Sequence, residues 1–325
     1  MTNLEARPPE IDAPAPSACG PTVQLLETRE VPLGGIRAMQ VRRTLPQRAR
    51  STVGAWCFLD AFGPSDVPMT VLPHPHTGLQ TVTWPLAGEI RHRDSLGNDL
   101  LVRPGELNLM TAGTGIAHSE ISADGVELAG VQLWAALPDG VDAPSFEHVA
   151  DLPGLSGDGW SGIVFVGEVG AVASPATVHT PLLGVDLISE PSTVLTLPLE
   201  PGFEHALLLV DGEAEVDGVP IPPGPLAFLG MQRESLTIHV GAEGARMLLL
   251  GGEPFEEPIV MFWNFVGRDH DAVARARADW EADARLPLED ARRRFGTVPG
   301  HGDDRIPAPV LPGARLKPRQ RPSGA

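Results

Sequence analysis

Two pairs of side chains in the first half of the chain have the types and spacing of metal ligands. His74 and His76 lie in the segment PHPHTG, and His118 and Glu120 lie in TAGTGIAHSE. Residues i and i+2 of a β-strand project from the same face, so both pairs can point toward one centre. Three imidazoles and one carboxylate suit iron, manganese, nickel, copper or zinc, and ligand identity alone does not choose among them. Four protein ligands leave two positions open on a six-coordinate ion, whereas a structural zinc site is normally closed.

The alternative interpretation is that His74 and His76 are surface-loop residues beside Pro73 and Pro75, and that His118 is a core histidine. The presence of two i, i+2 pairs, each next to a glycine-containing turn, favours the metal site.

The remaining histidines carry weaker signals. His92 alternates with Ile90 and is followed by Arg93 and Asp94, so we expect it to face solvent. Four others stand alone and are expected to be surface or packing residues: His148, His179, His270 and His301.

Short strands joined by tight turns must position the ligands. The chain contains 36 glycines and 34 prolines, and helical periodicity is scarce before residue 269. A second strand-rich half, residues 182–265, repeats the first: the segments 86–89 and 104–107 resemble 210–213 and 223–226. The pattern predicts an all-β fold with a duplicated barrel and a short helical segment at the C-terminal end.

The chain divides into six expected regions. They are a disordered leader (1–21), an N-terminal metal-binding barrel (22–150), a connecting region (151–181), a vestigial C-terminal barrel (182–268), C-terminal helices (269–296) and a disordered tail (297–325). Within the helical region, Asp269 is the expected N-cap of a helix over 272–284, and a second short helix is expected over 287–295.

Composition narrows the class of protein. A net charge of -18 and a pI near 4.9 disfavour direct nucleic-acid binding, which needs a basic face. Two cysteines, Cys19 and Cys57, make no disulfide framework, and the first residues lack the apolar run of a secretory signal. No apolar stretch is long enough to span a bilayer. We therefore expect a cytoplasmic monomer without membrane association.

Several segments together resemble the pirin family of the cupin superfamily. They are VRRTLP from 41, FLDAFGP from 58, PHPHTGLQTVTW from 73, GEIRHRDSLGN from 88, MTAGTGIAHSE from 110, VQLW from 131, and GGEP from 251 through PIVM from 258. The resemblance covers about residues 23–295. It implies two stacked cupin barrels, with iron(II) in the N-terminal barrel on His74, His76, His118 and Glu120.

The resemblance also implies a function, in one of two forms. Family members are described as flavonol (quercetin) 2,3-dioxygenases, or as iron-dependent regulatory proteins that bind a transcription factor or a metabolic enzyme. In the first form the metal would bind a deprotonated flavonol, and Glu120 would act as the base as well as a ligand. The second form is non-catalytic and depends on the redox state of the iron.

This chain departs from the family pattern at three positions: Gln80 replaces a usual glutamate, Ala61 a frequent histidine, and Thr114 an often basic residue. These changes put substrate preference and proton handling in doubt. In the second barrel, alignment on the glycine turns places Pro198, Glu200, Thr237 and His239 at the ligand positions, and no metal site is expected there. Glu204 and His205 are adjacent, so they should face opposite ways.

Overall fold

The N-terminal half of the protein consists of two antiparallel sheets. The computed structural model describes residues 20–33 and 39–318. One sheet has seven strands in the order β12 (Ser145–Val149), β9 (Leu107–Thr111), β6 (Leu79–Ala87), β11 (Leu128–Ala136), β4 (Trp56–Ser65), β3 (Met39–Leu45) and β2 (Arg29–Leu33). The other has four strands in the order β5 (Thr70–His76), β10 (Ile116–Ser122), β7 (Ile90–Asp94) and β8 (Asp99–Val102).

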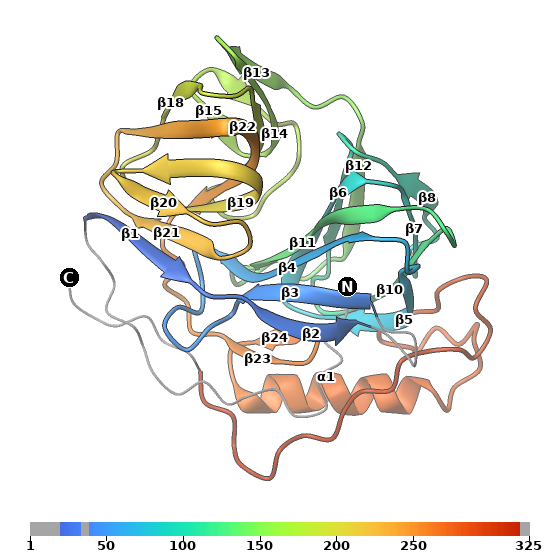
Figure 1. Ribbon diagram of the computed structural model, residues 1–325. Coiled ribbons are helices and arrows are strands. Elements are labelled where there is room, and N and C mark those ends of the chain that lie inside the picture. The colour runs from blue at the N-terminus through green and yellow to red at the C-terminus, as the bar shows by residue number, and fades with distance from the viewer. Residues whose placement is uncertain (1–19, 34–38, 319–325) are drawn as a thin grey trace.

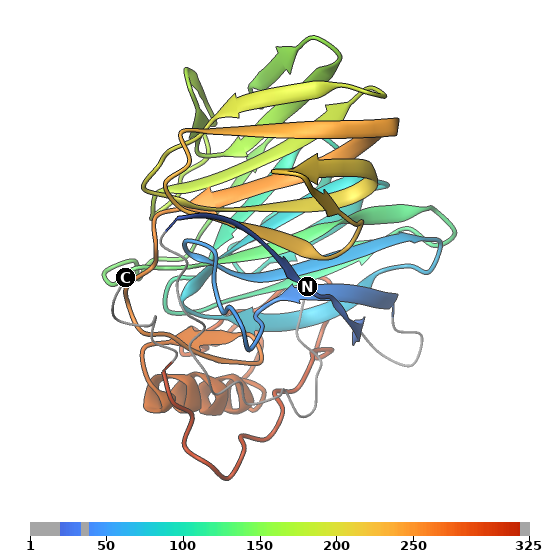
Figure 2. The same cartoon turned by 60° about the vertical axis from the view of Figure 1, so that its left-hand side comes forward.

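The C-terminal half is built on one nine-stranded antiparallel sheet. Its main path runs β1 (Pro21–Leu26), β21 (Leu226–Gly230), β19 (Glu204–Val216), β22 (Ser235–Gly252), β17 (Leu182–Ser189), β14 (Trp160–Val166) and β13 (Gly154–Gly157). Two further strands join it, β18 (Val194–Pro198) on β22 and β20 (Val219–Ile221) on β19. The fold class expected from the sequence, all-β with two stacked halves, is confirmed. Figure 1 and Figure 2 show the two halves side by side from two directions.

The division between the halves differs from the expected one at two places. β1 does not start the N-terminal half, because it pairs with β21 of the C-terminal sheet. The expected connecting region, 151–181, contains β13 and β14, and β14 pairs with β17 of that same sheet. Both segments therefore contribute to the C-terminal half. The expected leader lies almost entirely outside the described residues.

The last part of the chain returns to the N-terminal half. Two short hairpins and one helix complete the described structure: β15 (Glu168–Val169) with β16 (Val172–Ala173), β23 (Val260–Phe262) with β24 (Phe265–Gly267), and the helix α1 (His270–Asp283). Asp269 caps α1 as expected, since its side chain accepts a hydrogen bond from the backbone N–H of Ala272. Figure 1 shows α1 beneath β23 and β24. Among the described residues, no helix has the length and apolar character needed to cross a bilayer.

Two expectations for this region are wrong. Residues 287–295 form turns rather than a second helix. Residues 297–318 pack on the protein instead of forming a disordered tail: Val298 is buried, the backbone N–H of Ile306 donates to the carbonyl oxygen of Pro73, and the indole of Trp280 donates to the carbonyl oxygen of Ile306. The end of the tail, 319–325, lies outside the described residues.

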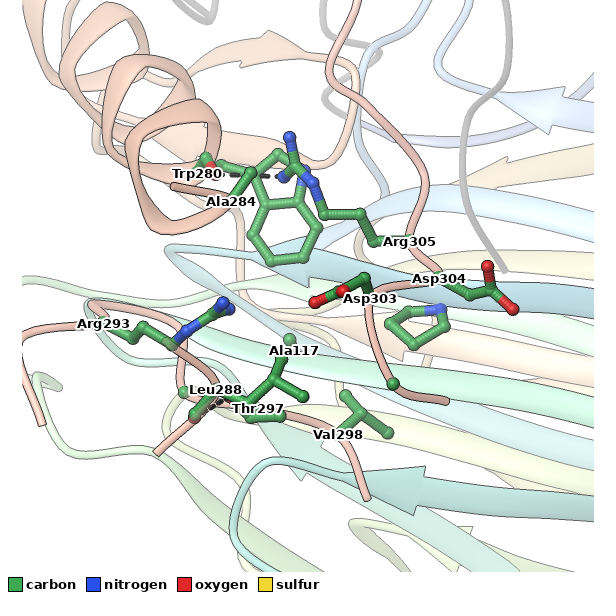
Figure 3. Close-up of a pocket in the computed structure, with 13 residues that line it drawn as sticks. Ala117, Trp280, Ala284, Leu288, Arg293, Thr297, Val298, Asp303, Asp304 and Arg305 are labelled. Atoms are coloured by element: carbon green, nitrogen blue, oxygen red, sulfur yellow. Dashed lines mark hydrogen bonds between the residues drawn. The ribbon is translucent and has the colours of Figure 1, made fainter. Parts of the chain in front are cut away.

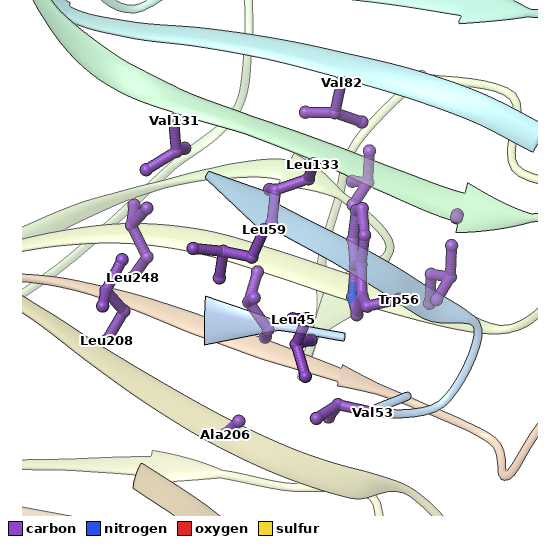
Figure 4. Close-up of a cluster of buried hydrophobic side chains, with 14 of the residues drawn as sticks. Leu45, Val53, Trp56, Leu59, Val82, Val131, Leu133, Ala206, Leu208 and Leu248 are labelled. Carbon is purple, nitrogen blue, oxygen red and sulfur yellow. The ribbon is translucent and has the colours of Figure 1, made fainter. Parts of the chain in front are cut away.

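The two halves share one apolar core. On β6, for example, Val82 and Trp84 project from the face of the strand that meets the C-terminal half. Figure 4 shows Val82, Val131 and Leu133 of the N-terminal half facing Leu208 and Leu248 of the C-terminal half. Burial of this apolar surface from both sides is the main favourable term that holds the halves together.

Polar contacts fix how the two halves meet. The indole N–H of Trp56 donates to the carbonyl oxygens of Leu183 and Gly251, at 3.1 Å each. Glu204 accepts hydrogen bonds from the Arg50 guanidinium and from a backbone N–H of the N-terminal half. Because these groups are buried, each bond also removes the cost of an unpaired polar group.

Candidate metal centre

The pairing of β10 with its two neighbours brings the candidate ligands onto one face of the four-stranded sheet. His118 lies opposite His74 on β5, and on its other side it lies opposite Asp94 of β7. Residues paired directly across antiparallel strands project from the same face. β5 is the edge strand of this sheet, which explains why it tolerates Pro73 and Pro75, since an edge strand can lack backbone donors.

The three histidines converge as the sequence predicted. The ring nitrogens of His74, His76 and His118 that could bind an ion lie within 4.8 Å of one another, and all three side chains are buried. The Nε2 atoms of His76 and His118 are 3.1 Å apart. Two imidazoles on one first-row metal ion, each at about 2.0–2.1 Å, have their nitrogens about 3.0–3.4 Å apart. The interpretation of His74 and His76 as surface-loop residues is therefore wrong.

Burial keeps these rings neutral. Loss of hydration lowers the pKa of His74 to about 3, and it holds the pKa values of His76 and His118 well below the usual value. Nδ1 of His74 donates to the carbonyl oxygen of Leu72 at 2.9 Å, while Nε2 of this buried ring has no hydrogen-bond partner among the described residues. Neutral rings with a free lone pair are what a metal ion requires, so the donor set fits such an ion.

Glu120 lies on the same face but forms a second, overlapping group. Its carboxylate oxygens lie within 4.8 Å of ring nitrogens of His92 and His118, whereas the structure does not place it in the tight cluster with His74 and His76. Thr83 on β6 donates to Glu120 Oε1 at 2.8 Å, and the Gln132 side-chain amide lies 3.1 Å from the same hydroxyl. The carboxylate is therefore held in place, and its role as the fourth ligand stays a prediction.

His92 and Asp94 are the site residues that sequence reasoning missed. The expectation that His92 faces solvent is wrong, because its side chain is buried and its ring stacks on Phe146, with centroids 4.4 Å apart. Asp94 Oδ2 lies 3.2 Å from Nε2 of His92. Burial raises the pKa of the Asp94 carboxyl, but hydrogen bonds from His92 and Asn98 outweigh it and leave this pKa below its usual value. The sequence did contain a signal for this pair, because His92 and Asp94 form a third i, i+2 pair.

Aromatic packing supports the histidines from another side. The Trp134 ring contacts His76 edge-on, with centroids 5.1 Å apart, and it stacks on Phe58 with centroids 3.9 Å apart. Arg43 covers the Phe58 ring and forms a buried ion pair with Asp60. These packed groups leave His76 little freedom to rotate.

The large side chains on the strands next to the ligands divide between the two faces of the sheet. Trp84 and Leu109 belong to the core between the halves, so neither lines the metal side. Met110 lies on the other face, in contact with Ile116 and Phe146. Two of the departures from the family pattern also face away from the ligands: Gln80 donates to Thr111 and to the carbonyl oxygen of Thr177, and Ala61 packs on the core between the halves.

The corresponding positions of the C-terminal half do not converge. The four residues aligned with the ligands are all exposed: Pro198, Glu200, Thr237 and His239. Glu204 faces the N-terminal half, while His205 projects from the opposite face of β19 and its ring lies 6.2 Å from that of Phe203, measured between centroids. Burial lowers the pKa of His205 to about 4.

A separate pocket lies outside the N-terminal half, behind β10. It lies between α1 and the tail with a volume of about 60 Å³, and Figure 3 shows Trp280, Arg293 and Arg305 around it. Ala117 lines its floor, and the next outward residue of β10, Ser119, lies 2.9 Å from Nε2 of His301. The inward ligands of β10 thus alternate with residues that the tail covers.

The fold and the buried histidine cluster together define a two-domain cupin with a candidate metal site in its N-terminal half. The sequence model described as Pirin matches residues 37–135, and the one described as Pirin C-terminal cupin domain matches residues 184–285. The chain belongs to the pirin family.

Individual relatives span most of the chain. A Pseudomonas aeruginosa protein named “Putative quercetin 2,3-dioxygenase PA1205” is 42% identical over 297 residues, which cover 89% of this chain and 91% of that protein. The crystal structure of a quercetin 2,3-dioxygenase from Acinetobacter baumannii superposes with a TM-score of 0.82 at 42% identity, covering 90% and 97% of the two chains. A bacterial pirin from Escherichia coli, crystallised in complex with nickel(II), has a TM-score of 0.58 at 18% identity over 72% and 100% of the chains and shares the fold alone.

Proposed function

We propose that this protein is a metal-dependent dioxygenase that acts on flavonols such as quercetin, with iron(II) as its metal. The observation that carries the proposal is the buried cluster of His74, His76 and His118, in which two Nε2 atoms lie 3.1 Å apart. The name of the Acinetobacter baumannii relative, which is 42% identical, supports the substrate class.

The residues proposed to hold the ion are the three histidines and Glu120. A bound divalent ion would supply a Lewis acid that lowers the pKa of a flavonol hydroxyl and a template for both reactants. The same donor set also suits nickel(II), the ion bound by the pirin from Escherichia coli. Metal analysis of the protein purified without added metals therefore tests the choice of iron.

The protein's own residues have separable tasks in this reaction. A bound ion would occupy the lone pairs of the three histidines, so we assign Glu120 as the group that accepts the proton of the flavonol hydroxyl. Thr83 would orient that carboxylate, because it already donates to Oε1 at 2.8 Å. A hydrogen bond of this kind favours the charged carboxylate and limits its rotation.

The test is oxygen uptake by iron-loaded protein with quercetin and several other flavonols. We expect turnover in the wild type and in the surface variant His239→Ala, and none in His118→Ala, which should also lose iron. Glu120→Gln separates two tasks: loss of turnover with iron retained assigns the proton-accepting role, and loss of both assigns a ligand role. If the iron-loaded wild type consumes no oxygen with any flavonol, the proposed function is wrong.

A further inference from the structure

The pair His92 and Asp94 has no task in the reaction just described, yet it lies against the metal centre. β7 presents both side chains on the face of the sheet that carries His118 and Glu120, because Asp94 pairs with His118 and His92 pairs with Glu120. Both side chains are fully buried. A buried histidine and a buried carboxylate are costly unless each makes specific hydrogen bonds, so their placement needs a physical reason.

The two nitrogens of His118 have different neighbours. Nε2 faces Nε2 of His76 at 3.1 Å, toward the proposed ion, whereas Nδ1 faces Nδ1 of His92 at 3.5 Å. A neutral imidazole carries one proton. If Nε2 of His118 binds a metal, its proton must be on Nδ1, and this N–H then points at His92.

The same reasoning fixes the proton of His92. To accept from His118, Nδ1 of His92 must carry the lone pair, so its proton must be on Nε2. That N–H points at Asp94 Oδ2, 3.2 Å away. Asp94 is itself held by the backbone N–H groups of Leu96 and Asn98 and by the Asn98 side-chain amide. In the series of hydrogen bonds from Asp94 through His92 to His118, only one arrangement of protons therefore gives every donor an acceptor.

We propose that His92, oriented by Asp94, is the positioning residue that fixes the tautomer and ring orientation of His118 for metal binding. The inference rests on the metal site proposed above and deepens it. Metal-bound histidines generally donate their second N–H to a carboxylate, a carbonyl or water, and loss of that outer partner costs about 10–100-fold in metal affinity. Here the partner is a second histidine, which passes the hydrogen bond on to a carboxylate.

A direct ligand role for His92 is the competing explanation, because its ring nitrogen lies within 4.8 Å of ligand atoms of His118 and Glu120. The two roles predict different substitutions to be tolerated. A carboxamide has one acceptor beside one donor and can replace His92 between His118 and Asp94. As a ligand of a transition-metal ion, however, a carboxamide is far weaker than an imidazole.

The experiment measures the affinity of metal-free protein for nickel(II) by competition with a chelator. We expect His92→Phe, which keeps an aromatic ring on Phe146 but removes both polar atoms, to weaken nickel binding by about 10–100-fold. His92→Gln should stay within about threefold of the wild type, and His239→Gln, on the exposed surface of the other half, should be unchanged. Thermal unfolding of each metal-free variant identifies any that fails to fold. Asp94→Asn, which replaces an acceptor by a donor, provides a second test and should also weaken binding.

Two results would overturn the inference. Nickel affinity of folded His92→Phe equal to that of the wild type would show that His118 needs no such partner. Affinity of His92→Gln as low as that of His92→Phe would make His92 a direct ligand instead. If the wild type binds nickel tightly but its iron-loaded form does not oxygenate flavonols, the proposed function is refuted and this inference still stands.

Discussion

Metal-free protein should lose stability steeply between pH 7.5 and pH 5.5, because its buried histidines cannot take up protons while folded. Burial lowers the pKa of His74 to about 3 and that of His205 to about 4, and it holds those of His76 and His118 well below the usual value. In the unfolded chain each ring regains a pKa of about 6.5. A depressed folded pKa gives stability that is full above about pH 6.5 and is lost as the pH falls toward the folded pKa.

The size of the effect follows from proton counting. Over this range each such histidine takes up most of one proton on unfolding and contributes about 1.4 kcal/mol, so the four together contribute about 5 kcal/mol. Carboxylates titrate mainly below pH 5 and contribute little. The assay is urea unfolding at both pH values in the presence of a chelator. His205→Phe, far from the ligands, should reduce the loss by about 1.4 kcal/mol. A total loss under about 2 kcal/mol would refute the claim that these rings are held neutral.

Three further outcomes are expected. Trp56→Phe removes the donor to two buried carbonyl oxygens of the C-terminal half and should lower the free energy of unfolding by about 2–3 kcal/mol in urea, so an unchanged midpoint would contradict the described contact. His118→Ala should remove most of the metal found by elemental analysis and His239→Ala none of it, and equal metal contents would reject the site. Gly113→Ala should destabilise by more than about 2 kcal/mol, because φ is +51° and a Cβ would lie 2.3 Å from a backbone oxygen; wild-type thermal stability would show that this turn can adjust.

The candidate ligands could be predicted because their signal is local. An i, i+2 spacing determines a shared face whichever strand lies alongside, so His74 with His76 and His118 with Glu120 were recognisable as pairs. The pair His92 and Asp94 has the same spacing, but it stands among charged residues that suggest solvent. Only the pairing of β7 beside β10 decides that this face points inward, and strand neighbours far apart in sequence are not encoded in any one segment.

The same distinction explains the rest of the fold. The helix capped by Asp269 depends on residues within a few positions, and it forms as expected. The pairing of β1 with β21 and the hydrogen bond between Ile306 and Pro73 depend on partners more than 200 residues away. Ile306 belongs to a proline-rich segment that looks extended in isolation, yet its N–H satisfies the carbonyl oxygen of Pro73 at the outer edge of the ligand sheet.

The C-terminal half supports the metal centre even though its own ligand positions are exposed. On β6 the outward residues Val82 and Trp84 alternate with the inward residue Thr83, which holds Glu120. A strand that carries a polar site on one face and large apolar side chains on the other must bury the second face. The C-terminal sheet does this, and the Trp84 indole even finds a buried acceptor there in Asp186, 3.0 Å away. The C-terminal half can therefore cover the strands that carry the candidate ligands without ligands of its own, because this task requires only a complementary apolar surface and a few fixed acceptors.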